Sequence, residues 1–151
     1  MSTRRNIRKG VFETNSSSVH SLVISSDGRE PSEFELNEYG EIEIDFGDFG
    51  KDYNIYSSQY EKLSYLITLA YYVSHGIGVD GVYNHWEFKK IRDAVCKYTG
   101  ATGIKILYEI DPYIDHQSIP EYEIDIIDIW DEDQIIDFVF NKYISLKTTC
   151  D

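Results

Sequence analysis

One segment in the middle of the chain is apolar on almost every side, and it limits the folds that the chain can adopt. Residues 65–73 read YLITLAYYV and contain no charged side chain. Just before them, Ser58 and Glu61 have the spacing of a capping box, which predicts a helix from Ser58 to about His75, ending at Gly76. A helix that is apolar all round must be surrounded by other elements. We therefore expect a central buried helix.

Two more helices are expected from their caps. Asn84 and Glu87 have capping spacing, and the amphipathic helix that follows, over residues 85–98, is the only basic helix of the sequence. Asp131 is expected to cap a third helix, which has acids in its first turn near the positive end of the helix dipole. Residues 76–81 are rich in glycine and predict a flexible connector between the first two helices.

Alternation of charged and apolar residues predicts strands. In residues 41–46 the side chains of Ile42, Ile44 and Phe46 would all point inward. This segment is expected to form a hairpin with a short strand near residues 34–36, because the residues between them favour a turn. Further strands are expected at residues 19–24, 103–110 and 122–129, and a loop at residues 47–56.

The order of strands, two helices, strands and a final helix predicts an α+β fold. We expect a single domain over residues 10–147, in which a small, mostly antiparallel sheet is packed by about three helices. Residues 1–9 are expected to be a basic N-terminal arm, and residues 148–151 a tail. A chain of 151 residues can bury most of its apolar surface without disulfides, so Cys96 and Cys150 are interpreted as reduced thiols.

Charge is the second strong feature of the sequence. The net charge is −13, which argues against direct binding of nucleic acid, because phosphate contacts need Lys and Arg. Eleven acids lie in residues 109–137, a segment without Lys or Arg, and nine lie in residues 27–48 beside a single Arg29. The two segments could merge into an acidic face that attracts a basic partner. The alternative is a solvated surface that only keeps the protein in solution.

A run of small hydroxyl residues interrupts the apolar pattern near the N-terminus, and a second polar group follows residue 114. Ser, His and carboxylate side chains are the types needed for nucleophilic catalysis, and a histidine beside an acid can also bind a phosphate or a metal. The alternative is a turn held by its own side chains and a structural histidine. The candidate catalytic residues are Ser17, His20, Asp115 and His116, and the candidate binding residues are Glu13, Asn15, Ser16, Ser18 and Ser118.

Residues 10–21, GVFETNSSSVHS, resemble the N-terminal signature of small, largely uncharacterised proteins of bacteriophages and bacterial prophages. Residues 113–118, YIDHQS, and 138–141, FVFN, resemble further segments of such proteins. The resemblance implies a phage or mobile-element origin and carries no assigned activity. Because small acidic phage proteins are often inhibitors of host defence, it leads us to expect an inhibitor that acts in the host cell cytoplasm.

The leading hypothesis is a non-enzymatic, anti-CRISPR-like protein that presents an acidic, nucleic-acid-mimicking face to the basic groove of a host protein or ribonucleoprotein. No cofactor, metal, membrane contact or direct nucleic-acid contact is expected, and a homodimer is compatible with the sequence. The alternative is a small enzyme or nucleotide-binding protein that uses the polar site of residues 13–20 and 115–118. The binding residues expected under the leading hypothesis are Asp125, Asp128, Glu132, Asp133 and Trp86, and neutralising these four acids together should abolish binding.

Overall fold

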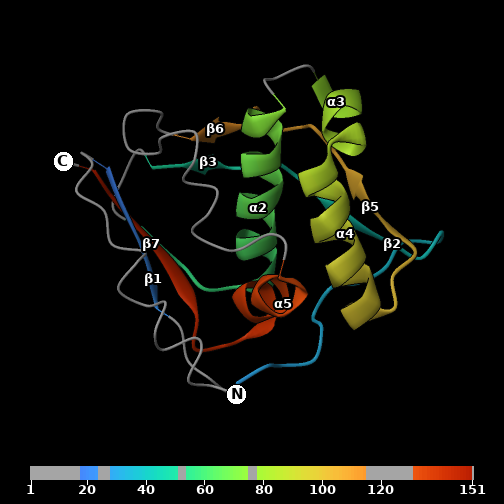
Figure 1. The fold of residues 1–151 in the computed structure, drawn as a ribbon, viewed down its shortest axis with the longest axis horizontal. Helices are drawn as coiled ribbons and strands as arrows, with labels where there is room; N and C mark the ends of the chain where they lie inside the picture. The colour runs from blue at the N-terminus through green and yellow to red at the C-terminus, as the bar shows by residue number, and fades with distance from the viewer. Residues whose placement is uncertain (1–17, 24–27, 51–53, 75–77, 115–130, 151) are drawn as a thin grey trace.

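The computed structural model describes residues 18–23, 28–50, 54–74, 78–114 and 131–150, with the backbone alone for 18–23 and 149–150. Over these ranges the protein has the α+β fold predicted from the sequence (Figure 1). Its described helices are α2 (Gln59–Val73), α3 (Gly78–Asn84), α4 (Trp86–Thr99) and α5 (Glu132–Phe140). Its described strands are β1 (Ser18–Val23), β2 (Glu41–Ile44), β3 (Asp48–Phe49), β4 (Asn54–Tyr56), β5 (Gly103–Ile106), β6 (Tyr113–Ile114) and β7 (Ser145–Cys150).

The strands form three small sheets. The largest is antiparallel, as expected, and has the order β1-β7-β4. The other two, β2 with β5 and β3 with β6, are parallel pairs. A parallel pair needs a long crossover, and here the chain between β3 and β5 supplies one that contains α2, α3 and α4.

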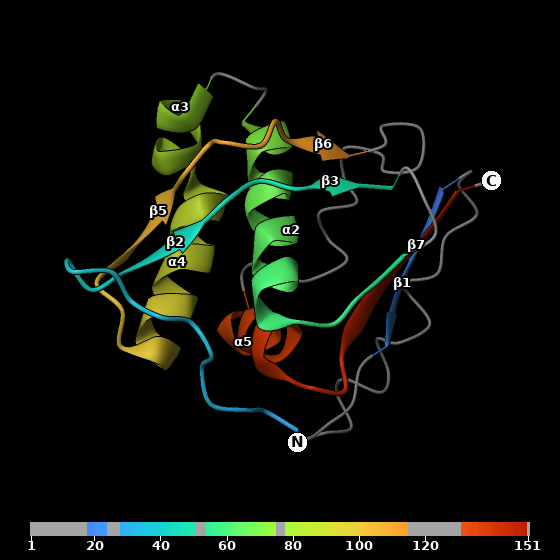
Figure 2. The same ribbon diagram turned by 180° about the vertical axis from the view of Figure 1, so that it is seen from behind.

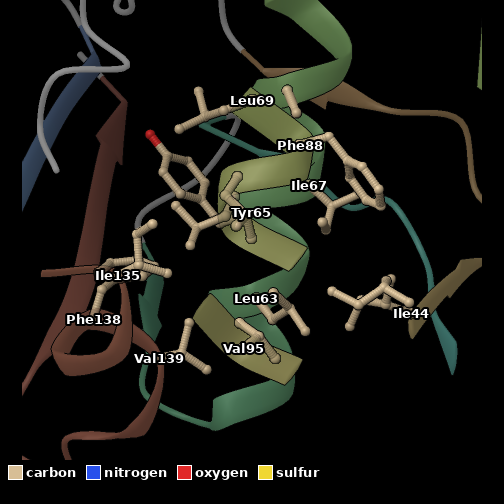
Figure 3. Packing of buried hydrophobic residues seen from close by; sticks show 14 of the residues in the cluster. Ile44, Leu63, Tyr65, Ile67, Leu69, Phe88, Val95, Ile135, Phe138 and Val139 are labelled. Carbon is tan, nitrogen blue, oxygen red and sulfur yellow. The ribbon is translucent and has the colours of Figure 1, made fainter. Parts of the chain in front are cut away.

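Helix α2 lies at the centre of the molecule, as its sequence predicts. Ser58 and Glu61 form the capping box, and every residue from Lys62 to Ala70 is buried. The helix contacts α3, α4, α5, β2 and β6. Figure 3 shows apolar side chains of α5, such as Phe138, on one side of α2, and Ile44 and Phe88 on the other. Burial of this apolar surface is the main term that stabilises the fold.

A stripe of hydroxyl groups on α2 holds the chain between β2 and β3. The residues are spaced by four, so they lie on one side of the helix. The Tyr60 hydroxyl accepts from the Asp45 N–H (3.1 Å), the Ser64 hydroxyl donates to the Asp45 carbonyl (2.7 Å), and the Thr68 hydroxyl accepts from the Gly47 N–H (3.0 Å). These bonds satisfy backbone groups that the break between the two strands would otherwise leave unpaired.

The buried Asp45 carboxylate connects this break to the segment between β5 and β6. Its Oδ1 accepts from the backbone N–H groups of Phe46 (2.8 Å), Glu109 (3.1 Å) and Ile110 (3.2 Å). Tyr108, just before these donors, has a left-handed backbone with φ of 56°. Such a conformation is costly for a tyrosine, so the Asp45 bonds help to hold it.

A buried lysine joins α2 to the end of α5. Lys62 has no exposed surface, and its Nζ donates to the carbonyls of Asn141 (2.9 Å) and Ile144 (2.8 Å). Asn141 is the C-terminal cap of α5, so the cation lies at the negative end of that helix dipole. Burial disfavours the charged form and lowers the pKa of Lys62 to about 8.

Several segments differ from the sequence expectation. Residues 48–49 and 54–56 form β3 and β4 instead of a loop, because each pairs with a strand far away in the sequence. Residues 145–150 form β7, so the expected tail at 148–151 is part of the sheet up to Cys150, and Thr148 is fully buried. Strands β3 and β4 are too short to show an alternating pattern, so they are defined only by their distant partners.

The glycine-rich connector is also different, since residues 78–84 form α3. The cost of its glycines, about 1 kcal/mol each, is offset by burial of Val82 and by the edge contact of the Tyr83 and Phe88 rings, whose centroids are 5.3 Å apart. Helix α4 consequently begins one residue later than expected. Its cap is His85, whose Nδ1 accepts from the Glu87 N–H at 3.2 Å.

We expect Asp45→Ala to lower the free energy of unfolding by about 2–4 kcal/mol, because three backbone N–H groups lose their acceptor. Asp45→Asn is the matched control, since it keeps an acceptor oxygen and loses the charge, and it should cost clearly less. Chemical denaturation of both variants measures the difference. Equal losses would contradict the role given to these hydrogen bonds.

We expect the contribution of Lys62 to stability to rise with pH. The unfolded chain keeps the Lys62 proton up to a pH near the ordinary pKa of 10.5, while the folded chain releases it near 8, so raising the pH through this window favours folding. The stability of the wild type relative to Lys62→Met should increase by up to about 3 kcal/mol over this window. Denaturation curves at several pH values measure it, and a constant difference would contradict the lowered pKa.

Candidate functional site

The polar site predicted from the sequence lies mostly outside the described residues. Ser18 and His20 are in β1, where the backbone alone is described. Two of the acids expected to bind a partner also lie outside the described residues. The predicted site residues outside the described ranges are Glu13, Asn15, Ser16, Ser17, Asp115, His116, Ser118, Asp125 and Asp128.

The strand that carries His20 pairs with the most distant part of the chain. In the register of the antiparallel sheet, His20 is opposite Thr148 of β7, and Thr148 is opposite Asn54 of β4. Side-chain hydrogen bonding with Thr148 and Asn54 opposes the rise that burial causes in the pKa of Tyr56. The backbone at His20 is therefore one strand away from the buried Thr148 and the half-buried Tyr56.

The strand pair before residue 115 contacts the same sheet. Ile114, the last described residue before this segment, pairs with Phe49 in the β3–β6 sheet. The Phe49 ring contacts the ring of Tyr56 on β4, edge to face, with centroids 5.0 Å apart. One aromatic contact thus joins the sheet that contains β1 to the β3–β6 pair, and the predicted site residues that follow Ile114 lie outside the described residues.

The tyrosines of this region are structural hydrogen-bonding groups. Burial raises the pKa of Tyr56 and of Tyr72. The Tyr72 hydroxyl donates to the Pro112 carbonyl (3.2 Å) and accepts from the Ile114 N–H (3.4 Å), so it holds the start of β6. Phenols with raised pKa values stay protonated at neutral pH, so these tyrosines position strands and do not act as bases.

The described residues contain neither a metal-binding cluster nor a membrane-spanning helix. Within those ranges, no group of three or more His, Cys, Asp or Glu side chains could hold a metal ion. No described helix has both the length and the apolar character needed to cross a membrane. Cys96, on α4, is a free thiol whose pKa is raised by burial.

The acids at the start of α5 are less available than the sequence suggests. The Glu132 carboxylate lies 3.3 Å from the Lys97 ammonium, and the Asp133 carboxylate lies 3.5 Å from the Arg29 guanidinium. Arg29 also bonds the buried Asp137, with Nε 2.6 Å from Oδ1. The sequence shows no cation in this segment, but folding brings two from elsewhere, so this part of the expected acidic face is partly neutralised.

Trp86, the other described binding candidate, is partly exposed, with 41% of its surface accessible. It is the first residue of α4, and its ring stacks on the ring of His85 with centroids 6.0 Å apart. This stacking holds the indole next to the cap of the helix. The described binding candidates therefore come from two helices: Trp86 lies on α4, and Glu132 and Asp133 lie on α5.

The binding residues predicted from the sequence did not include a second acidic surface, although its acids belong to the two acidic segments of the sequence. It lies along β2 and along the chain after β5, where exposed and partly exposed carboxylates alternate with apolar residues. Within the described ranges, no Lys, Arg or His nitrogen lies within 4.0 Å of these carboxylates. The alternation in residues 41–46 was the available signal, but it indicated a strand rather than an interface. The carboxylates belong to Glu35, Glu38, Glu41, Glu43, Glu109 and Asp111.

Comparison with known proteins gives no relative: no protein-family model, curated protein or solved structure matches this chain. The site must therefore be argued from its own residues.

We expect Arg29→Met to lower the free energy of unfolding by about 2–3 kcal/mol, because it leaves the buried Asp137 carboxylate without its guanidinium. Arg92→Met is the matched control: the Arg92–Asp93 pair is exposed, so its loss should cost less than about 1 kcal/mol. Adding Asp137→Asn to Arg29→Met should recover part of the loss. Denaturation curves measure all three, and similar costs for both arginines would contradict a structural role for Arg29.

Proposed function

We propose that this protein is a phage-type inhibitor that binds a host factor, in the manner of an anti-CRISPR protein, by presenting an acidic face to a basic nucleic-acid groove. The observation that carries the proposal is the set of exposed carboxylates along β2 and after β5 that have no cation partner among the described residues. The host cell cytoplasm is the proposed place of action, and the partner is a host protein or ribonucleoprotein.

The physical argument rests on unpaired charge. A carboxylate that is ion-paired within its own protein must lose that pair, or share it, before it can bind a partner cation. Glu43, Glu109 and Asp111 meet no such competition within the described ranges. Together with a net charge of −13, they give a field that repels nucleic acid and attracts a basic protein, which speeds the encounter and favours basic partners.

The resemblance of residues 10–21 to a signature of phage and prophage proteins supports the choice of a host target. A phage protein with this charge can compete with nucleic acid for a groove lined by Lys and Arg, because both present closely spaced negative charges. The proposal requires no catalytic group.

A second candidate function uses the predicted polar site of residues 13–20 and 115–118. It is supported by the path of contacts from Ile114 through Phe49 and Tyr56 to Thr148, which links the strand before residue 115 to the sheet that contains β1. Under this alternative the protein is a small enzyme or a nucleotide-binding protein, and His20 and His116 act in the site. It differs from the inhibitor in depending on single side chains rather than on total charge.

The proposal is tested by binding and inhibition of a purified CRISPR effector–guide complex, with target cleavage as the readout. We expect binding that weakens steeply as salt increases, because the attraction is between exposed charges. Neutralising Glu35, Glu38, Glu43 and Glu109 together should weaken it more than neutralising Asp125, Asp128, Glu132 and Asp133, since the last two acids are ion-paired. The latter change is therefore no longer expected to abolish binding.

The same assay separates the two functions. Binding that does not depend on salt would contradict a charge mimic. Loss of function in His20→Ala or His116→Ala, with an unchanged melting temperature, would favour the polar site instead. If no effector complex is bound, a pull-down from host lysate followed by reconstitution with the purified captured protein applies the same salt and charge tests.

A further inference from the structure

Residues 40–45 and 102–111 run side by side as a two-stranded strip, and residues 35–39 form the turn before it and fold back along β2, where Leu36 bridges Ile42. The pairing begins where the Thr102 N–H donates to the Gly40 carbonyl (2.8 Å), and β2 and β5 continue it in parallel. It extends beyond β5 through the bond from the Leu107 N–H to the Ile44 carbonyl (2.9 Å) and the bonds to Asp45 Oδ1. We call these residues the β2–β5 strip.

The two sides of the β2–β5 strip have opposite character. On the inner side, Ile42, Ile44, Ile104 and Ile106 are buried in the core. Figure 2 shows that α2 and α4 lie behind the strip, on this side. Side chains alternate along a strand, so the exposed residues between these isoleucines, such as Glu43, face the other way. Among the described residues, helices therefore cover the strip on one side only.

Large apolar side chains are exposed at both ends of the strip. Near its start, Leu36 and Tyr39 have 42% and 71% of their surface accessible, and near its end Tyr108 and Ile110 have 40% and 49%. These four make up half of the large apolar residues that are exposed in the described part of the chain. Exposed apolar side chains with polar residues next to them in the chain are typical of a protein interface.

The exposed aromatic residues are held in fixed backbone positions. Asn37 Oδ1 accepts from the N–H groups of Tyr39 and Glu41, both at 2.9 Å, and Thr102 Oγ1 donates to the Tyr39 carbonyl at 2.8 Å. The Tyr108 ring packs edge-on against Phe46, with centroids 5.3 Å apart. Binding through such residues loses little conformational entropy, which is a property of interface anchors.

We propose that the β2–β5 strip is the docking surface, and that its partner is a folded protein surface with apolar pockets rimmed by Lys and Arg. Charge decides the partner, because six carboxylates lie among these apolar residues along the chain and Lys105 is the cation on the outer side of the paired strands. A second copy of this chain and a nucleic acid carry the same sign of charge and are disfavoured. The inference rests on the proposed function and gives it a location.

The test uses two synthetic peptides of equal charge, one alternating Arg with Leu and the other alternating Arg with Gly, titrated into the isotope-labelled full chain and followed by NMR. We expect the Arg/Leu peptide to bind more tightly and to shift the amide signals of residues 36–43 and 107–111. Tyr39→Ala and, separately, Glu43→Lys should each weaken binding about tenfold. Ile55→Ala is the control, because Ile55 is also an exposed apolar residue, at 49% against 71% for Tyr39, but lies on β4.

Four results would overturn this location while leaving the proposed function intact: shifts centred on α5, equal binding of the two peptides, an equal effect of Ile55→Ala, or self-association through the strip in sedimentation. Preferential binding of an RNA oligonucleotide in the same titration would overturn both proposals. The proposed function itself would be overturned if neither peptide binds and no basic protein partner binds in a salt-dependent way. Melting curves of each variant show that a lost interaction is not a lost fold.

Discussion

The structure depends on the way in which Asp45 ties three segments together. Its backbone is held by Tyr60 and Ser64 of the central helix, and its carboxylate holds the N–H groups of residues 109 and 110. The parallel strand pairs on either side of this point are only two to four residues long, so their own hydrogen bonds are few. The three backbone hydrogen bonds to the buried Asp45 carboxylate hold these short strand pairs in position, and both the core and the exposed strip depend on them.

The helices could be predicted from the sequence because their signals are local. The start of α2 is indicated by Ser58 and Glu61, and the start of α5 by Asp131 and the acids that follow it. The apolar run in α2 indicates that this helix is buried. Strands β3, β4 and β7 could not be predicted, because β3 and β4 are only two and three residues long and all three depend on partners elsewhere in the chain. Helix α3 was not predicted, because its glycines have low helix propensity and the packing of Val82 and Tyr83 that stabilises it cannot be seen in the local sequence.

The acidic surface of the proposed function could also be predicted only in part. The count of acids along the chain predicted an acidic protein correctly, but it could not show that Arg29 and Lys97 fold back onto Asp133 and Glu132. Nor could it show that Tyr39 would stand exposed in a turn fixed by Asn37 and Thr102. Linear sequence gives the amount of charge, whereas the partners of each charge are set by contacts between residues far apart.

The pairing of β1 with β7 has a consequence for how the protein is made. Val23 pairs with Ser145 and Ser18 with Cys150, so β1 cannot join its sheet until residues 145–150 have been synthesised. Before then the β2–β5 strip can pair, since its own contacts lie between residues 35 and 111, whereas α2 still lacks its contacts with α5 and the bonds from Lys62 to Asn141 and Ile144. A nascent chain interrupted before residue 145 would therefore carry a paired strip beside an unpaired β1.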